Sequence, residues 1–222
     1  MVIIKEILRL TYGLAKAFFL KFYEVMLSYI SLFADEFNDK RLGIKTLGAS
    51  FKKEERSEFK DEVDYEATPY SLLKEIASEL KPKKSDVFID MGCGKGRVPI
   101  YFSTFNIKKS IGIELRKSLF EIAQNNVNTL KQKHCEIEII NQDVLKYNFH
   151  YETIIFMFNP FGWRTMMGII GKIKASLRGN KRKITVVYFN PIYELLFIMD
   201  TDFKLIKRIK KHNLTVAMYR IG

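Results

Sequence analysis

The residues whose types and spacing best suit chemistry form a short glycine-rich segment, Asp90-Met91-Gly92-Cys93-Gly94-Lys95-Gly96-Arg97. An apolar run at 87–90 leads into it and a helical pattern at 98–105 follows, so a strand, a glycine loop and a helix are expected in that order. Glycine lets the backbone approach a ligand closely, and the free N–H groups at the start of a helix can hold an anionic group. The segment is therefore typical of a ligand-binding loop.

The spacing of this segment argues against two common ligands. A dinucleotide-binding loop needs a third glycine or alanine, but that position holds Arg97 or Pro99, depending on which glycine is counted first. A P-loop needs Ser or Thr after its lysine, whereas Gly96 follows Lys95. Nicotinamide dinucleotides and nucleoside triphosphates are therefore disfavoured.

Two further acids follow the next two apolar runs. Glu114 ends the run 110–114, and Asp143 closely follows the run 137–141. Because the carboxyl ends of parallel strands meet at one edge of a sheet, Asp90, Glu114 and Asp143 are expected to converge on one crevice. Glu114 is placed to accept hydrogen bonds from both hydroxyls of a ribose, and Asp143 from an adenine amino group.

The elements that must position these acids alternate along the chain. Apolar runs at 87–90, 110–114, 137–141, 153–158 and 184–189 alternate with helical patterns at 98–105, 119–130 and 165–177. This alternation predicts an α/β fold with a doubly wound, mostly parallel sheet. The last two runs, 203–209 and 214–221, are too close for a parallel crossover and predict an antiparallel hairpin. Ahead of the sheet, Thr68 and Pro69 predict the start of a helix with Thr68 as its cap.

The first 64 residues differ in character from the rest. Residues 1–34 predict an amphipathic helix, because six charged side chains fall on one arc of the helix and the apolar side chains fall on the other. The six charged residues are Lys5, Glu6, Arg9, Lys16, Lys21 and Glu24. No stretch approaches the ~20 apolar residues of a membrane span. We expect this helix to pack on the main domain or a second subunit, with docking on a membrane surface as the alternative. The highly charged segment 52–66 predicts a connector, so the expected units are an extension, 1–64, and a main domain, 65–222.

Composition narrows the class of protein. The 222 residues contain 37 basic and 25 acidic side chains, a net charge of +12, and the excess lies after residue 80, including basic clusters at 164–183 and 204–211. Such a field favours anionic partners. Cys93 and Cys135 are too few for a disulfide framework or a four-cysteine zinc site, so we expect a cytoplasmic protein without a metal.

Together, the glycine loop, the three acids and the terminal hairpin resemble the class I S-adenosylmethionine-dependent methyltransferases, which have a seven-stranded Rossmann-like sheet. The resemblance implies S-adenosyl-L-methionine as cofactor, bound by Asp90, Gly92, Gly94, Gly96, Glu114, Leu115, Asp143, Val144 and Asn159. It assigns the glycines to the methionine part of the cofactor, Asp90 to its amino group, Glu114 to the ribose and Asp143 to the adenine, which Leu115 and Val144 would flank. Segments 37–46, 65–70, 90–97 and 158–162 further resemble a bacterial group of methyltransferases of unassigned substrate, over about residues 35–222.

The segment after the fourth run, Asn159-Pro160-Phe161, is expected at the acceptor side. It is similar to the Asn/Asp-Pro-Pro-aromatic signature of N-methyltransferases and to the Asn-Asn-Phe segment of histone-lysine methyltransferases. This likeness implies Asn159, Pro160, Phe161 and a lid residue, Tyr70, as catalytic candidates. The expected function is N-methylation of a macromolecule, with protein lysine ahead of an RNA or DNA base. The alternative is a non-catalytic cofactor-binding protein at the membrane periphery.

Overall fold

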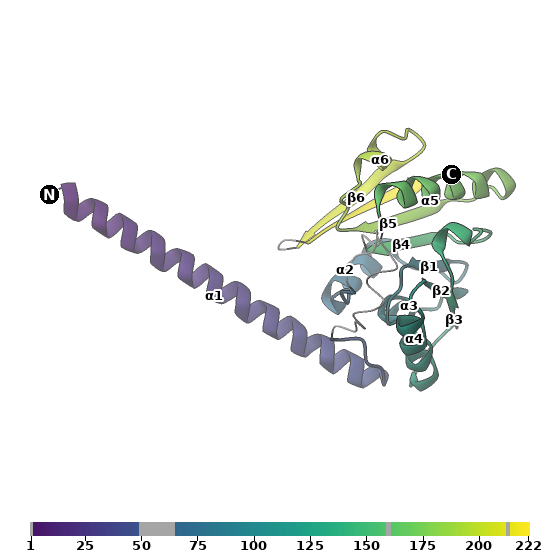
Figure 1. Ribbon diagram of the computed structural model, residues 1–222, viewed down its shortest axis with the longest axis horizontal. Helices are drawn as coiled ribbons and strands as arrows, with labels where there is room; N and C mark the ends of the chain where they lie inside the picture. Colours follow the sequence, from purple (N-terminus) through teal and green to yellow (C-terminus); the bar gives the residue numbers. More distant parts are fainter. Residues whose placement is uncertain (1, 49–64, 159–160, 212–213) are drawn as a thin grey trace.

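The computed structural model describes residues 2–48, 65–158, 161–211 and 214–222. Its centre is a seven-stranded sheet in the order β3-β2-β1-β4-β5-β7-β6 (Figure 1). The strands are β1 (Val87–Met91), β2 (Lys109–Glu114), β3 (Glu136–Asn141), β4 (Ile154–Phe158), β5 (Ile184–Phe189), β6 (Lys204–Lys211) and β7 (Leu214–Ile221). All seven predicted strands are therefore present, each within two residues of its predicted bounds.

The sheet is parallel except at its carboxyl-terminal hairpin. β1 pairs in parallel with β2 and β4, and β4 pairs in parallel with β5. β7 pairs antiparallel with both β5 and β6, so it lies between them. The predicted hairpin is confirmed, and its insertion beside β5 completes a Rossmann-like methyltransferase sheet.

Successive side chains of each strand point to opposite faces of the sheet, and helices cover both of these faces. Val87, Ile89 and Met91 join a core cluster with α5 (Trp163–Gly179) and α6 (Leu195–Ile198). Phe88, between them, joins a second cluster with α2 (Tyr70–Leu80) and α3 (Arg97–Phe102). α4 (Lys117–Thr129) packs beside β3 and completes the doubly wound arrangement.

The amino-terminal helix, α1 (Val2–Leu42), is longer than predicted and runs away from the sheet (Figure 1). Only its end enters the domain, where Leu42 and the following Ile44 belong to the second core cluster. The large apolar side chains described between residues 12 and 33 are exposed, except for the partly buried Leu27. The expectation that this part packs on the main domain is therefore wrong. The predicted charged connector falls almost wholly outside the described residues.

The start of α2 also differs from the prediction, because Thr68 does not cap it. The first residue of the helix is Tyr70, whose N–H donates to Asp35 Oδ1 of α1 over 3.0 Å. An aspartate from a distant segment thus replaces the local cap, and Thr68 is left buried with its carbonyl bonded elsewhere. Sequence spacing alone does not reveal a cap supplied across 35 residues.

Candidate cofactor and acceptor site

The three predicted acids lie at one edge of the sheet. Asp90 is the fourth residue of β1, Glu114 is the last of β2, and Asp143 follows β3 by two residues. The parallel register pairs Asp90 with Gly112 and Glu114 with Asn141. The carboxyl ends of β1, β2 and β3 therefore bring these side chains to the same side, as expected.

The glycine loop has a backbone that favours glycine at three alternating positions. Gly92, Gly94 and Gly96 have φ values of 82°, 55° and 84°, all in the left-handed region. A Cβ on Gly96 would also lie 3.1 Å from the Cβ of Ala123 in α4, and a Cβ on Gly94 would run into the ring of Tyr65. The loop is thus held close to its neighbours, with Gly96 at the start of α3.

Glu114 connects this loop to the end of β2. Its Oε2 accepts from the Gly94 N–H over 2.8 Å, and its Oε1 accepts from the Arg116 N–H over 2.9 Å. Burial raises the pKa of Glu114, and these backbone hydrogen bonds partly oppose the shift. Each carboxylate oxygen can accept more than one hydrogen bond, so Glu114 can hold the loop and still receive a ribose hydroxyl.

Asp90 is the most deeply buried of the three acids, and its residue is only 2% exposed. Burial and the neighbouring Glu114 raise the pKa of Asp90 well above its usual value. A buried acceptor of this kind suits an ammonium group, so it fits the amino group of the expected cofactor.

The predicted adenine side of the site includes the short helix η2 (Val144–Lys146). Asp143 caps this helix, with Oδ1 accepting from the Leu145 N–H over 2.8 Å. Val144 is 5% exposed and packs in the core, whereas Leu115 and Leu145 are each 37% exposed. Leu115 and Leu145 therefore offer more apolar surface to an adenine ring than Val144 does. The cofactor roles of Asp143, Leu115 and Val144 stay predictions.

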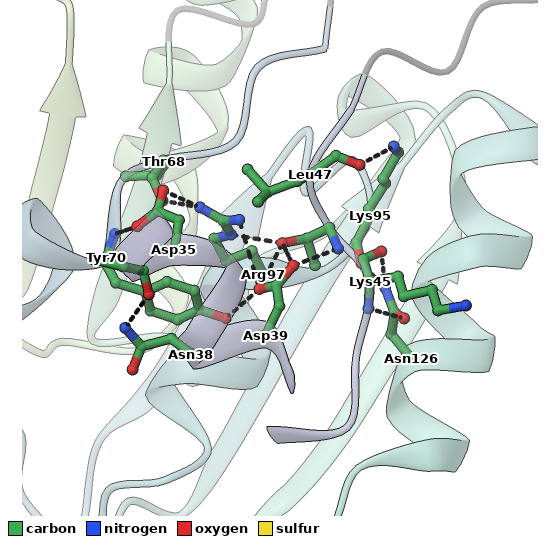
Figure 2. A network of polar contacts seen from close by, with 12 residues as sticks. Asp35, Asn38, Asp39, Lys45, Leu47, Thr68, Tyr70, Lys95, Arg97 and Asn126 are labelled. Atoms are coloured by element: carbon green, nitrogen blue, oxygen red, sulfur yellow. Dashed lines mark hydrogen bonds and ion pairs between the residues drawn. The ribbon is translucent and has the colours of Figure 1, made fainter. Parts of the chain in front are cut away.

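Arg97, the last residue of the glycine segment, is the centre of a buried polar network (Figure 2). Its Nη1 donates to Asp35 Oδ2 over 2.7 Å and to the Thr68 carbonyl over 3.1 Å. Its Nε donates to the Thr46 hydroxyl over 2.6 Å, and its Nη2 lies 3.5 Å from Asp39 Oδ1. These contacts tie the end of α1 and the segment before α2 to the cofactor loop.

Tyr70, a predicted catalytic residue, belongs to this Arg97 network. It is 6% exposed, its ring lies 4.6 Å from the Arg97 guanidinium, and its hydroxyl donates to Asp39 Oδ1 over 2.8 Å. Burial and Asp39 raise the pKa of Tyr70. In this arrangement Tyr70 helps to hold the segment that precedes α2, and a direct role in catalysis stays a prediction.

A second set of contacts fixes residues 45–48 over the loop. Lys95 Nζ donates to the carbonyls of Leu47, over 3.2 Å, and Gly48, over 2.5 Å. Asn126 of α4 donates to the Lys95 carbonyl over 2.9 Å and exchanges hydrogen bonds with the backbone of Lys45. The loop is therefore held from three sides, by β2, α4 and the chain that follows α1.

Sequence reasoning missed these supporting residues. In the sequence, Arg97 argues against a dinucleotide but does not reveal Asp35 and Asp39 as its partners. Asn141, whose side chain donates to the carbonyls of Glu114 and Leu115 over 2.9 Å each, was also missed. One usable signal was the pair of aspartates four residues apart at the end of an amphipathic helix, which places both carboxylates on one face.

Aromatic residues lie next to the predicted acceptor segment. Phe158 and Phe189 end β4 and β5 and stack with ring centroids 3.9 Å apart. Phe161 is partly buried against the first core cluster, and Trp163, the first residue of α5, is 49% exposed. Asn159 and Pro160 lie outside the described residues, so their roles stay predictions. Within the described part of the chain, no group of three or more His, Cys, Asp or Glu side chains is arranged to hold a metal ion.

Comparison with known sequences places this geometry in context. Residues 59–184 match the family described as ribosomal RNA adenine dimethylase. The chain is 30% identical over 149 residues to a histone H3 lysine-79-specific N-methyltransferase of Dictyostelium discoideum. This alignment covers 61% of the chain but 8% of that protein. It is also 30% identical over 93 residues to a protein-lysine N-methyltransferase of Saccharolobus islandicus, covering 37% of this chain and 58% of that protein. The match thus spans less than two thirds of either relative.

Comparison with solved structures supports the fold. An RNA methyltransferase from Salinibacter ruber, in complex with S-adenosyl-L-homocysteine, superposes with a TM-score of 0.51 at 17% sequence identity. The superposition covers 71% of this chain and 94% of that structure. The shared architecture is the Rossmann-like methyltransferase sheet.

Proposed function

Since the chain belongs to the ribosomal RNA adenine dimethylase family and is an S-adenosylmethionine-dependent methyltransferase, we propose that it methylates a nitrogen on a macromolecule, with protein lysine as the preferred acceptor. S-adenosylmethionine, when bound, supplies a methyl group on a positively charged sulfur. The protein has to hold the acceptor nitrogen in line with that methyl group, and such orientation can contribute roughly 7 to 11 kcal/mol.

The observation that carries the methyltransferase assignment is the edge formed by Asp90, Glu114 and the glycine loop. The buried carboxylate of Asp90 stands beside a loop whose three glycines all have left-handed backbone conformations. The same edge holds an acid at the end of β2 that is already aligned by two backbone N–H groups. This donor and acceptor set fits the amino acid and ribose of one cofactor.

The aromatic surface beside the cofactor edge favours lysine. Before it can attack, a lysine ammonium must lose a proton, and apolar surroundings lower its pKa. Phe158, Phe161 and Trp163 offer such surroundings next to the predicted acceptor segment, Asn159-Pro160. The two relatives described above are lysine N-methyltransferases, which supports the same acceptor class.

A nucleobase is the second candidate, supported by the family name and by the net charge of +12. Many of the basic side chains expected to attract phosphate are already paired with acids of the protein. Five residues of the two basic clusters form such ion pairs: Lys174, Arg182, Lys207, Arg208 and Lys211. Because paired cations attract phosphate less strongly, these ion pairs favour lysine over a nucleobase as the acceptor.

Methyl transfer from radiolabelled S-adenosylmethionine tests the proposal. The full chain is incubated with separate protein and RNA fractions, and the labelled products are hydrolysed to amino acids and nucleosides. We expect label in methyl-lysine. Label in methyladenosine with none in methyl-lysine would overturn the lysine assignment in favour of the nucleobase.

Two variants separate catalysis from folding. Asn159→Ala is expected to reduce labelling, because Asn159 is proposed to orient the acceptor. Asn148→Ala, which removes an exposed side chain bonded to Lys172, serves as the control and should retain wild-type labelling. Equal labelling by both variants would contradict the role of Asn159.

A further inference from the structure

Helix α1 carries a large apolar surface that its own domain leaves uncovered. Twelve apolar side chains between residues 12 and 33 are each 42–71% exposed: Tyr12, Phe18, Phe19, Leu20, Phe22, Tyr23, Val25, Met26, Tyr29, Ile30, Leu32 and Phe33. Isolated exposed apolar residues are common, but a contiguous apolar surface of this length is typical of an interaction site. In Figure 1 this part of α1 projects away from the sheet and its helices.

These side chains are confined to one side of the helix. At about 100° per residue, all except Leu20 fall on one half of the circumference, which we call the apolar arc. Asp35, Asp39 and Leu42, which join the helix to the domain, fall on the other half. The apolar arc therefore faces away from the domain over a length of about 33 Å.

The borders of the apolar arc are basic. By the same geometry, Lys16 lies just beyond one edge and Lys21 just beyond the other, and both are exposed. A lysine at such a border can lay its alkyl stem along an apolar phase and keep its ammonium group in water. Arg41 adds a basic group in the last turn of the same helix, whereas Lys40 there is paired with Glu36.

The width of the apolar arc distinguishes between two occupants. A coiled-coil partner covers a narrow seam of the helix, so a second copy of α1 would leave much of a half-circumference exposed. A helix lying in a membrane interface buries a broad apolar face and keeps its polar half in water. No helix in the described part of the chain is long and apolar enough to cross a membrane.

We propose that the apolar arc of α1 docks on the surface of an anionic lipid bilayer, with the helix parallel to the membrane plane. The lysines at the borders of the apolar arc match a negatively charged headgroup layer. Because the polar half of α1 holds the Arg97 network, docking leaves the contacts between the helix and the cofactor loop in place. This surface is independent of which acceptor the enzyme methylates.

Co-sedimentation of the full chain with lipid vesicles tests the proposal. We expect binding to vesicles of phosphatidylcholine and phosphatidylglycerol and much weaker binding to phosphatidylcholine alone. The double variant Phe22→Glu/Phe33→Glu, at the centre of the apolar arc, should lose about tenfold or more in binding. Its matched control, Leu20→Glu/Ser31→Glu, adds the same charge outside the apolar arc and should bind like the wild type.

Three results would overturn the proposal. Equal losses in the two double variants would show that charge alone, and not the apolar arc, governs binding. Equal binding of the wild type to neutral and anionic vesicles would remove the basis for an anionic surface. Absence of vesicle binding, together with a dimer in sedimentation velocity that only Phe22→Glu/Phe33→Glu abolishes, would assign the apolar arc to a second copy of the chain.

Discussion

The two ends of helix α1 use opposite chemistry. Near its carboxyl end, Asp35 and Asp39 are buried, charged and bonded to Arg97 of the cofactor loop. Between residues 12 and 33, the described side chains are mainly apolar and yet exposed. A folded domain normally buries apolar side chains and exposes charged ones, so this helix reverses both tendencies.

The buried, charged end of α1 helps to hold the candidate site, whereas the exposed apolar part of the helix extends beyond the domain. Buried ions cost desolvation energy, and Arg97 is paired with both Asp35 and Asp39, so this network ties the glycine loop to the end of α1. The exposed apolar arc contributes nothing to the core that the structure describes. We therefore expect changes at the first end to affect stability and cofactor binding, and changes at the second end to affect neither.

The largest effect is expected from Arg97→Met. It leaves Asp35 and Asp39 as buried carboxylates without their cation, which should lower the free energy of unfolding by roughly 3 to 5 kcal/mol. Urea denaturation measures this change. Lys40→Met is the control, because Lys40 and Glu36 form an exposed pair, and it should cost less than about 1 kcal/mol. Similar costs for the two variants would refute the central position of Arg97.

A smaller loss is expected from Gly94→Ala. The left-handed backbone costs an alanine about 1 to 2 kcal/mol, and its Cβ would also displace the Tyr65 ring. Gly171→Ala, in helix α5, is the matched control. No atom lies within 4 Å of its added Cβ, so it should stabilise the protein by about 0.5 to 1 kcal/mol. Thermal unfolding of both variants checks the opposite signs.

The pH dependence of stability reports on Asp90. Its pKa is raised in the folded protein, so folding favours the protonated carboxyl group. The stability that this group contributes is present below the unfolded pKa, about 3.9, and is lost as the pH rises through the raised folded value. Asp90→Asn should flatten this decline in urea titrations across that range, and an unchanged slope would argue against the burial of an ionisable Asp90.

The smallest effect is expected from Phe22→Glu/Phe33→Glu. Both side chains are more than half exposed, so the free energy of unfolding should stay within about 0.5 kcal/mol of the wild type. Urea denaturation in the absence of lipid measures it. A loss of several kcal/mol would place the apolar arc against the domain and erase the contrast between the two ends of α1.

The fold was predictable from the sequence because its signals are local. Each buried strand is a short apolar run, and the turn between β6 and β7 is too short for a crossover. Asp90, Glu114 and the three glycines were predictable for the same reason, since each lies at the end of a strand or in the loop that follows. Their placement at one edge then follows from parallel pairing.

The supporting contacts were not predictable because they join distant segments. Asp35 reaches Arg97 across 62 residues, and it displaces Thr68 from the cap of α2. A buried arginine in the glycine segment has no local pattern that names its partners. The exposure of α1 was likewise hidden, because an amphipathic pattern indicates an apolar face without showing what covers it.

Calorimetric titration of the full chain with S-adenosyl-L-methionine tests the central claim most directly. We predict saturable binding at one site per chain, weakened about tenfold or more by Glu114→Gln, because a charged acceptor for the ribose is lost. Glu121→Gln, an exposed change on α4, should bind like the wild type. Absence of binding to the wild type, or equal affinity of the wild type and Glu114→Gln, would contradict the assignment of this edge as the cofactor site.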